Sequence, residues 1–276
     1  MGIEVQQKLP MLDYLRSHGL SSSALAMADE SMAKFHAYMQ GKIKYESKSL
    51  SLGTEVHAAL EDMNEYLRSR VVKPDGVDYR TKVGKEFRDS IESWQTLIDR
   101  ETLQTVMGCV DSYRDSTDRL ITIARDSKGE NEVSCFWEEQ GLQMKARADS
   151  LVEVVGEDNE YLAEHWPTLF NPISNKIVVD FKTTSKSASP KSFGYAIRDF
   201  KYALKSVHYL EGFKADAFLW IVLETSPPFH ITRYLLSAES DRYYVERRKI
   251  LINQISECSE SGVWPGLVIT DEETLI

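Results

Sequence analysis

The stretch NKIVVDFKTTSK, residues 175–186, places an aspartate and a lysine two positions apart inside a run that is otherwise apolar. Its apolar members are Ile177, Val178, Val179 and Phe181. Such a run predicts a buried β-strand, and because side chains alternate between the two faces of a strand, Asp180 and Lys182 share one face. Burying an unpaired charge is costly, so the pair predicts a shared partner. A divalent cation suits an aspartate at the end of a strand.

A second carboxylate, Asp149, stands at the end of a predicted hairpin around Gly141, in the sequence KARADSL. A sheet that pairs this hairpin with the strand at 176–184 would bring Asp149 close to Asp180. Carboxylates and waters are the oxygen ligands that Mg²⁺ prefers, and a nearby lysine can orient or help to deprotonate a metal-bound water. The combination with Lys182 indicates metal-assisted phosphodiester hydrolysis. The DxK pattern alone equally fits a solvated edge strand with an ordinary ion pair.

The order of periodic segments predicts a mixed α/β protein with an N-terminal helical part. Apolar residues at helical spacing predict helices at 21–41, at 53–70 and, as two helices, at about 84–125. The later predicted elements are two strands around Gly141, a strand at 176–184, a helix from Ser189-Pro190 to about Gly212, strands at 215–224 and 229–236, and a helix at 239–262. Residues 156–175 predict an irregular insert. We expect a single domain for a chain of 276 residues.

The charge distribution limits the possible partners. A net charge of −10 and a pI near 5.2 argue against a surface that coats nucleic acid as a whole. Between Lys182 and Lys205, however, six basic residues stand against one acid, Asp199. They form either one solvated helix face or a set of phosphate contacts, and we favour the second: Lys186, Lys191, Arg198, Lys201 and Lys205.

Other features of the sequence point to a cytoplasmic protein without a membrane partner. No stretch reaches the roughly 18 uninterrupted apolar residues of a bilayer span, and MGIEVQQKLP lacks a basic region followed by an apolar run. The three cysteines have no CxxC spacing, so neither a disulfide framework nor a zinc site is predicted.

Several motifs together resemble one nuclease superfamily. Asp149 followed by VVDFKTT resembles the PD-(D/E)xK core, and LGTEVHAALED, residues 52–62, resembles the G-x-x-x-H helix of RecB-like and RecE-like exonucleases. EVSCFWEEQGLQMKARADSL resembles their hairpin, and FKYALKSVHYLEGF resembles the tyrosine-bearing helix that follows the core. ISECSESGVWPGL resembles the tryptophan-proline ending of the exonuclease VIII type. The likeness, which includes a lambda-exonuclease-like core, spans roughly residues 20–267.

The resemblance implies a fold and an activity. The fold is a restriction-endonuclease-like core, a mixed central sheet flanked by helices, at about 126–267, after a mainly helical part at about 1–125 and before a tail at 268–276. The implied activity is a Mg²⁺-dependent deoxyribonuclease, with Mn²⁺ as a possible substitute. It digests linear double-stranded DNA from 5′ to 3′ and leaves 3′ single-stranded tails for homologous recombination. A homo-oligomeric ring, a single-strand annealing recombinase as partner, and a bacterial or phage-infected cytoplasm are implied as well.

The same resemblance assigns roles to individual residues. Asp149 and Asp180 bind the metal, and Lys182 activates or positions the attacking water. His57 adds a nitrogen ligand or contacts the scissile phosphate. Glu132 matches the acid at the start of the hairpin, with a supporting or solvated role. Tyr209 matches the helix tyrosine, which orients Lys182, contacts DNA or simply packs.

Two departures from the family pattern leave alternatives open. Ala148 stands where the family has proline before the aspartate, and Lys205 stands where it has glutamine one turn before the tyrosine. One rival hypothesis is therefore a catalytically altered or silent DNA-binding or assembly protein on the same fold. The others are an endonuclease, a single-strand or 3′-directed nuclease, and a hydrolase of small phosphate esters.

Overall fold

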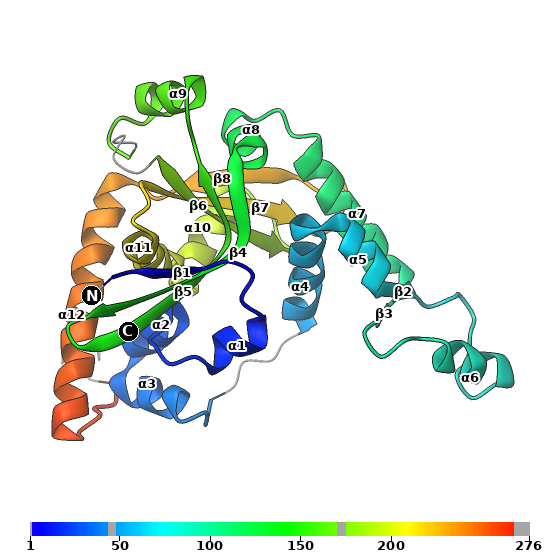
Figure 1. Ribbon diagram of the computed structural model, residues 1–276, viewed down its shortest axis with the longest axis horizontal. Helices are drawn as coiled ribbons and strands as arrows, with labels where there is room; N and C mark the ends of the chain where they lie inside the picture. The colour runs from blue at the N-terminus through cyan, green and yellow to red at the C-terminus, as the bar shows by residue number, and fades with distance from the viewer. Residues whose placement is uncertain (1, 44–47, 170–174, 268–276) are drawn as a thin grey trace.

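A six-stranded mixed sheet runs through the protein in the order β1-β4-β5-β6-β7-β8 (Figure 1). The computed structural model describes residues 2–43, 48–169 and 175–267, and in the second range it describes side chains from Leu52 onward. The strands are β1 Glu4–Gln6, β4 Lys128–Glu139, β5 Leu142–Glu153, β6 Lys176–Thr184, β7 Ala217–Glu224 and β8 Ile231–Leu235. Only the β6–β7 pair is parallel among these neighbours, and all other pairs are antiparallel.

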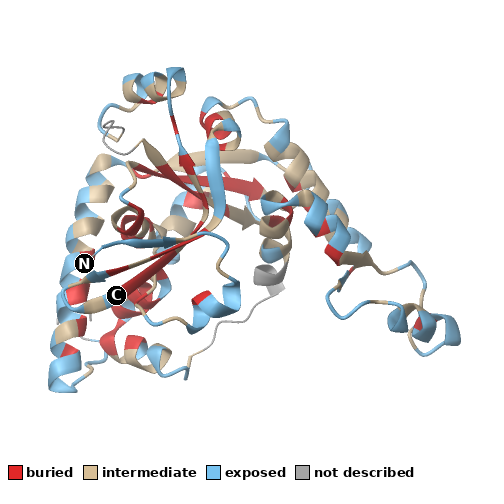
Figure 2. Ribbon diagram, in the orientation of Figure 1, coloured by how far each residue is buried: buried red, intermediate tan, exposed pale blue. Residues whose placement is uncertain are grey.

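Helices cover both faces of the sheet, and each face has its own apolar core (Figures 1 and 2). One core lies against α2 Ser22–Glu30, α3 Met32–Met39, α11 Tyr202–Phe213 and α12 Ala238–Ser261. The other lies against α4 Lys48–Glu61, α7 Arg100–Arg114 and α8 Arg119–Asp126. Burial of these apolar side chains is the main force that stabilises the layers. The predicted fold class, a mixed sheet flanked by helices with an N-terminal helical part, is confirmed.

Strand β6 follows the alternation predicted from its sequence. Val179 and Phe181 pack into the core under α4, whereas Val178 belongs to the core under α11. Asp180 and Lys182 therefore occupy the α11 side of the sheet by alternation. The connection from β6 to its parallel neighbour β7 runs through α10 Pro190–Asp199 and α11, so these helices lie directly after the candidate site in the chain.

An arm projects from the body of the protein (Figure 1). It contains α5 Met63–Ser69, β2 Arg70–Val72, α6 Lys82–Asp89 and β3 Thr96–Ile98, and β2 pairs with β3 in parallel. The helix predicted to begin at about residue 84 is shorter than expected, because α6 ends at Asp89 and Ile98 lies in a strand. Trp94, between the two elements, is 52% exposed.

Three segments predicted as single helices are interrupted. At Ser31 the backbone is extended and the side chain accepts a hydrogen bond from the Lys34 N–H, which begins α3. Asp62 begins α5 in the same way by accepting from the Glu65 N–H. Short polar side chains compete with the helical backbone for such hydrogen bonds, so they start new helices within an apolar period. At Lys201 a left-handed residue, with φ of 56°, separates α10 from α11.

The β4–β5 hairpin is joined to α11 and α12 by a largely buried network of an ion pair and hydrogen bonds. Both guanidinium Nη atoms of Arg248, on α12, donate to Glu139 at 2.9 and 2.5 Å, and its Nε lies 3.2 Å from Nδ1 of His208 on α11. His208 Nε2 lies 3.1 Å from the carbonyl oxygen of Lys145. Burial, together with the Arg248 charge, lowers the pKa of His208 to about 3, so this ring is neutral at physiological pH. The network fixes α11 relative to the hairpin that carries Asp149.

The remaining elements include several that the sequence did not reveal. A helix, α9 Glu157–His165, occupies much of the predicted irregular insert, while residues 170–174 of that insert and the predicted tail at 268–276 lie outside the described residues. A short helix, α1 Met11–Arg16, follows β1. All three cysteines are unpaired and buried. Among the described helices, none is both long and apolar enough to cross a membrane.

Candidate active site

The two aspartates come together at one point of the sheet. Ser150 of β5 pairs with Val179 of β6 in an antiparallel register, so the next positions along, Asp149 and Asp180, lie opposite each other. The backbone N–H of Phe181 donates to Oδ2 of Asp149 at 2.7 Å. This hydrogen bond takes the place of ladder pairing and fixes the Asp149 carboxylate against β6.

Helix α4 brings His57 to the same carboxylate. Val56 and Ala59 are buried in the core and hold the helix on the sheet. At Gly53 an added Cβ would lie 3.2 Å from the Thr183 hydroxyl oxygen, so a glycine permits the close approach of α4 to β6. Nδ1 of His57 then lies 3.4 Å from Oδ2 of Asp149. The spacing of G-x-x-x-H is explained by this contact.

Lys182 joins this cluster through its contact with Asp180. Its ammonium is in ion-pair contact with Oδ2 of Asp180 and donates to the Phe181 carbonyl oxygen at 3.2 Å. The ammonium also lies 5.3 Å from the centre of the Tyr202 ring, at the start of α11. These side chains are mostly buried, with Asp180 15% and Lys182 23% exposed. The site is therefore a shielded cluster with an opening to solvent.

The charges in this cluster influence one another. Burial raises the pKa of Asp149, but the His57 ring, the Lys182 ammonium and the Phe181 N–H together hold it below its ordinary value. For Asp180, burial and the neighbouring Asp149 charge outweigh Lys182 and leave the pKa raised. Burial lowers the pKa of His57, whereas Asp149 raises it above its ordinary value. For Lys182 the two carboxylates outweigh burial and raise its pKa to about 12.

Glu132 faces Asp149 from strand β4. The register pairs Asn131 with Ser150 and Val133 with Ala148, which puts Glu132 opposite Asp149, and there the ladder is interrupted because Glu132 has a φ of 54°. A left-handed conformation is strained for a glutamate and is found where the surrounding structure enforces it.

Arg147 fixes the glutamate side chain. Its Nε donates to Oε2 of Glu132 at 2.5 Å, and its Nη1 donates to the Leu9 carbonyl oxygen and to the Ser134 hydroxyl oxygen. Glu132 is therefore an ion-pair partner of Arg147 that borders the site.

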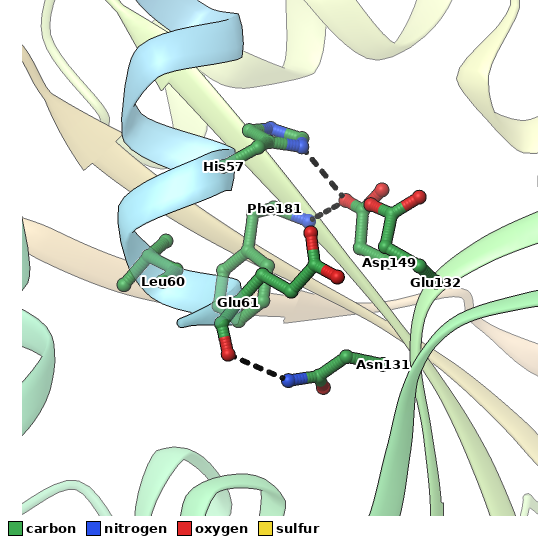
Figure 3. Close-up of a pocket in the computed structure, with 7 residues that line it drawn as sticks. All are labelled: His57, Leu60, Glu61, Asn131, Glu132, Asp149 and Phe181. Atoms are coloured by element: carbon green, nitrogen blue, oxygen red, sulfur yellow. Dashed lines mark hydrogen bonds and ion pairs between the residues drawn. The ribbon is translucent and has the colours of Figure 1, made fainter. Parts of the chain in front are cut away.

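A small cavity of about 10 Å³ opens between α4 and the hairpin (Figure 3). This is about the space that one water molecule needs. Figure 3 shows the carboxylates of Asp149 and Glu132 side by side, with Glu61 extending from α4. The cavity is lined by His57, Leu60, Glu61, Asn131, Glu132, Asp149 and Phe181. Burial and the nearby Glu132 carboxylate raise the pKa of Glu61.

Glu61 was not among the candidates drawn from the sequence. It follows His57 by four positions on α4, so both side chains lie on the same face of the helix. This spacing was the available signal, and it is visible in the motif HAALE. The amide of Asn131 donates to the Glu61 carbonyl oxygen at 3.2 Å and holds this end of the helix against the hairpin.

The donor set is chemically suited to a hard divalent cation. It offers carboxylates from Asp149 and Asp180 and an imidazole from His57, and the buried Oδ2 of Asp180 is in contact with the Lys182 ammonium. No group of three or more His, Cys, Asp or Glu side chains in the described parts of the chain is already gathered as a metal cage. His57 and Lys182 instead face the two carboxylates, and a cation would displace these contacts. The types of ligand atom that these residues offer suit a divalent cation.

Tyr209, on α11, packs against the core on the α11 side of the sheet. Its ring meets Phe218 edge-on with centroids 5.7 Å apart and lies near Phe213, and burial raises its pKa well above the ordinary value. Its hydroxyl makes no described hydrogen bond to Asp180 or Lys182.

The predicted phosphate-binding residues fall into two groups. Lys201 is paired with Asp29 at 3.0 Å and so joins α11 to α2, and Arg198 lies 3.4 Å from Asp199. Lys205 lies 5.4 Å from the centre of the Tyr202 ring, and burial together with the Lys182 charge lowers its pKa. None of Lys186, Lys191 and Lys205 forms an ion pair with another described residue.

The fold and the cluster define a class: a mixed α/β protein that directs paired aspartates, a lysine and a histidine to one place on its sheet. No protein-family model matches the chain, and no curated protein matches its sequence. A solved structure of a candidate exonuclease from Eubacterium rectale matches with a TM-score of 0.59 and 11% identity, over 98% of this chain and 93% of that chain. This likeness shows the fold. A second structure, SSO0001, covers 73% of this chain and 86% of its own at 14% identity, but its TM-score of 0.28 is too low to inform the fold.

Proposed function

We propose that the protein is a deoxyribonuclease that depends on Mg²⁺, with Mn²⁺ as a substitute. The observation that carries this proposal is the convergence of Asp149 and Asp180 with Lys182 and His57. Clusters of perturbed titratable groups at one place in a fold are typical of catalytic sites. The fold likeness to a protein named as a candidate exonuclease supports the same class of activity.

Asp149, Asp180 and His57 are the residues that would hold the cation. When bound, the cation supplies charge neutralisation at the phosphate and lowers the pKa of a coordinated water. The Phe181 N–H bond to Asp149 keeps that carboxylate directed at Asp180, and His57 flanks it from α4. Glu61 adds a carboxyl group next to Asp149 in the cavity, which favours a cation there, whereas the charge of Glu132 is offset by Arg147.

Lys182 is proposed to position the phosphate and the attacking water. Its ammonium is held by Asp180 and the Phe181 carbonyl oxygen, so it projects a fixed positive charge at the place where negative charge develops during attack on phosphorus. Of the three roles considered for Tyr209, simple packing agrees best with its contact with Phe218.

The basic residues after β6 are proposed to contact the DNA backbone. Lys186, Lys191 and Arg198 are exposed, and Lys205 stands beside Tyr202 at the site, whereas Lys201 is engaged by Asp29. The remaining detail rests on the sequence resemblance alone. We propose on that ground a 5′-to-3′ exonuclease on linear duplex DNA, which leaves 3′ tails for recombination and acts as a homo-oligomeric ring beside a single-strand annealing protein.

Digestion of end-labelled DNA tests the proposed function. A linear duplex labelled at 5′ or at 3′ ends would be sampled over time with Mg²⁺ and again with EDTA, beside a closed circular duplex of the same sequence. We expect early release of the 5′ label, gradual shortening of the 3′-labelled strand, an intact circle, and no cleavage in EDTA.

Each other outcome has a defined meaning. Cleavage of the circle would replace the exonuclease by the endonuclease hypothesis, and early release of the 3′ label would reverse the direction. Equal cleavage in EDTA would show that the activity does not depend on a divalent cation. Absence of cleavage with both Mg²⁺ and Mn²⁺ would favour the DNA-binding or assembly protein.

A further inference from the structure

Two exposed aromatic rings lie on and directly after α10, the helix that follows β6 in the chain. Phe200 is 59% and Tyr195 52% exposed, although both are large apolar side chains. Tyr195 shares an exposed face of α10 with Lys191 and Arg198, four positions before it and three after it. The guanidinium of Arg198 lies 5.1 Å from the centre of the Tyr195 ring.

The Phe200 ring is linked to the catalytic cluster through a single aromatic side chain. Phe200 stacks on Tyr202 with centroids 5.5 Å apart and ring planes 30° apart. The same Tyr202 ring lies 5.3 Å from the Lys182 ammonium and 5.4 Å from that of Lys205. A flat group that stacks on Phe200 would therefore lie one ring away from the lysine proposed to act on the phosphate.

The position of Phe200 is fixed by its neighbours along the chain. Lys201, in a left-handed conformation, is anchored to Asp29, and Asp29 also accepts from Arg247 at 2.7 Å. Tyr202 packs near Phe193, which is buried. The exposed ring is thus held outward between anchored residues, which reduces the entropy that is lost when a ligand binds.

The chemistry of this surface selects the ligand. Phosphate groups suit its basic residues, of which residues 186–205 contain five against one acid. Basic side chains interleaved with exposed aromatic rings are typical of proteins that bind single-stranded nucleic acid, because each unpaired base offers a flat face for stacking. In a duplex those faces are covered by neighbouring base pairs. The rings can therefore stack on a base only at the end of a duplex or where the strand is unpaired.

We propose that Phe200 and Tyr195 stack on unpaired nucleobases of a DNA strand beside the site. This rests on the proposed nuclease function. Single-stranded DNA then binds with its phosphates on Lys191 and Arg198 and with its bases on the two rings.

Binding to short oligonucleotides in EDTA, where no cleavage occurs, tests this surface. Fluorescence anisotropy would compare a labelled single strand with an abasic strand of equal length for the wild type, Phe200→Ala, Tyr195→Ala and Phe200→Trp. Tyr243→Ala is the matched control, because Tyr243 on α12 is also an exposed ring, at 64%. We expect about tenfold weaker binding of the base-bearing strand for each alanine variant at 195 and 200. Phe200→Trp and Tyr243→Ala should bind as the wild type does.

The abasic strand isolates the stacking. It should bind the wild type and both alanine variants equally, since only phosphates are left to contact. Equal binding of the base-bearing strand by wild type, Phe200→Ala and Tyr195→Ala would overturn the stacking surface. If the wild type cuts DNA with Mg²⁺ but these variants bind normally, the surface fails and the nuclease stands. A wild type that neither cuts nor binds DNA would refute the proposed function itself.

Discussion

Asp180→Asn is expected to slow DNA cleavage by at least about a thousandfold while the protein stays folded. An amide of the same shape keeps the packing of β6 but is a poor ligand for Mg²⁺, and it removes one of the two charges that face the cluster. Burial raises the pKa of Asp180, so its charge is held at a cost, and removing that charge should change the thermal midpoint by less than about 5 °C. Cleavage rates and thermal unfolding measured on the same preparation check both parts.

A control for Asp180→Asn is the same substitution at Asp158. That residue lies on α9 and pairs with Arg119, outside the site. Asp158→Asn should cut DNA at the wild-type rate. Full activity in Asp180→Asn would end the assignment of this aspartate to the site. If the variant is unfolded at the assay temperature, its single-turnover cleavage rate would be measured at a lower temperature at which it is folded.

Lys182→Met is expected to lower the single-turnover rate by about a hundredfold to ten thousandfold while divalent cations still bind. Methionine keeps most of the aliphatic stem but lacks the ammonium that lies between Asp180 and the Phe181 carbonyl oxygen. Because both carboxylates remain and lose a competing positive charge, cation affinity should be unchanged or higher. Rapid-quench cleavage and calorimetric titration with Mn²⁺ measure the two effects separately.

Lys191→Met provides the matched comparison for Lys182→Met. Lys191 is an exposed lysine on α10 without an ion pair to a described residue, so its loss should weaken DNA binding modestly and leave the rate at saturating DNA unchanged. A single-turnover rate in Lys182→Met equal to that of the wild type would remove the positioning role of Lys182.

The convergence of Asp149, Asp180 and Lys182 could be predicted because it depends only on side-chain alternation along a strand and on the order of the strands. Alternation along β6 places Asp180 and Lys182 on one face, and an antiparallel neighbour that ends its hairpin at Asp149 must meet them. Local pattern also predicted the strands β7 and β8 and the final helix α12. In these segments the apolar period is uninterrupted.

The positions of Glu132 and Glu61, which border the site, could not be predicted from side-chain alternation and element order. The position of Glu132 depends on a left-handed backbone and on Arg147, which itself bonds the Leu9 carbonyl oxygen far away in the sequence. Glu61 became visible only once α4 was placed against the hairpin. Both depend on contacts between distant segments, which periodicity does not encode.

Helix boundaries were mispredicted for a related reason. Ser31 and Asp62 lie inside stretches whose apolar spacing continues across them, yet each caps a new helix with its side chain. The strand β1 is short, and its three residues pair only with β4, so no pattern within the segment marks it. Tertiary context decides such elements more than local sequence does.

A crystal grown with Mn²⁺ would show whether Asp149 and Asp180 share a divalent cation. Anomalous scattering would locate the ion without reference to activity. We expect an anomalous peak within about 2.0–2.6 Å of oxygens from both carboxylates, with His57 turned toward it or beside it. Mn²⁺ peaks only at other places, with His57 and Lys182 still in contact with the two aspartates, would show that the two carboxylates do not share a cation.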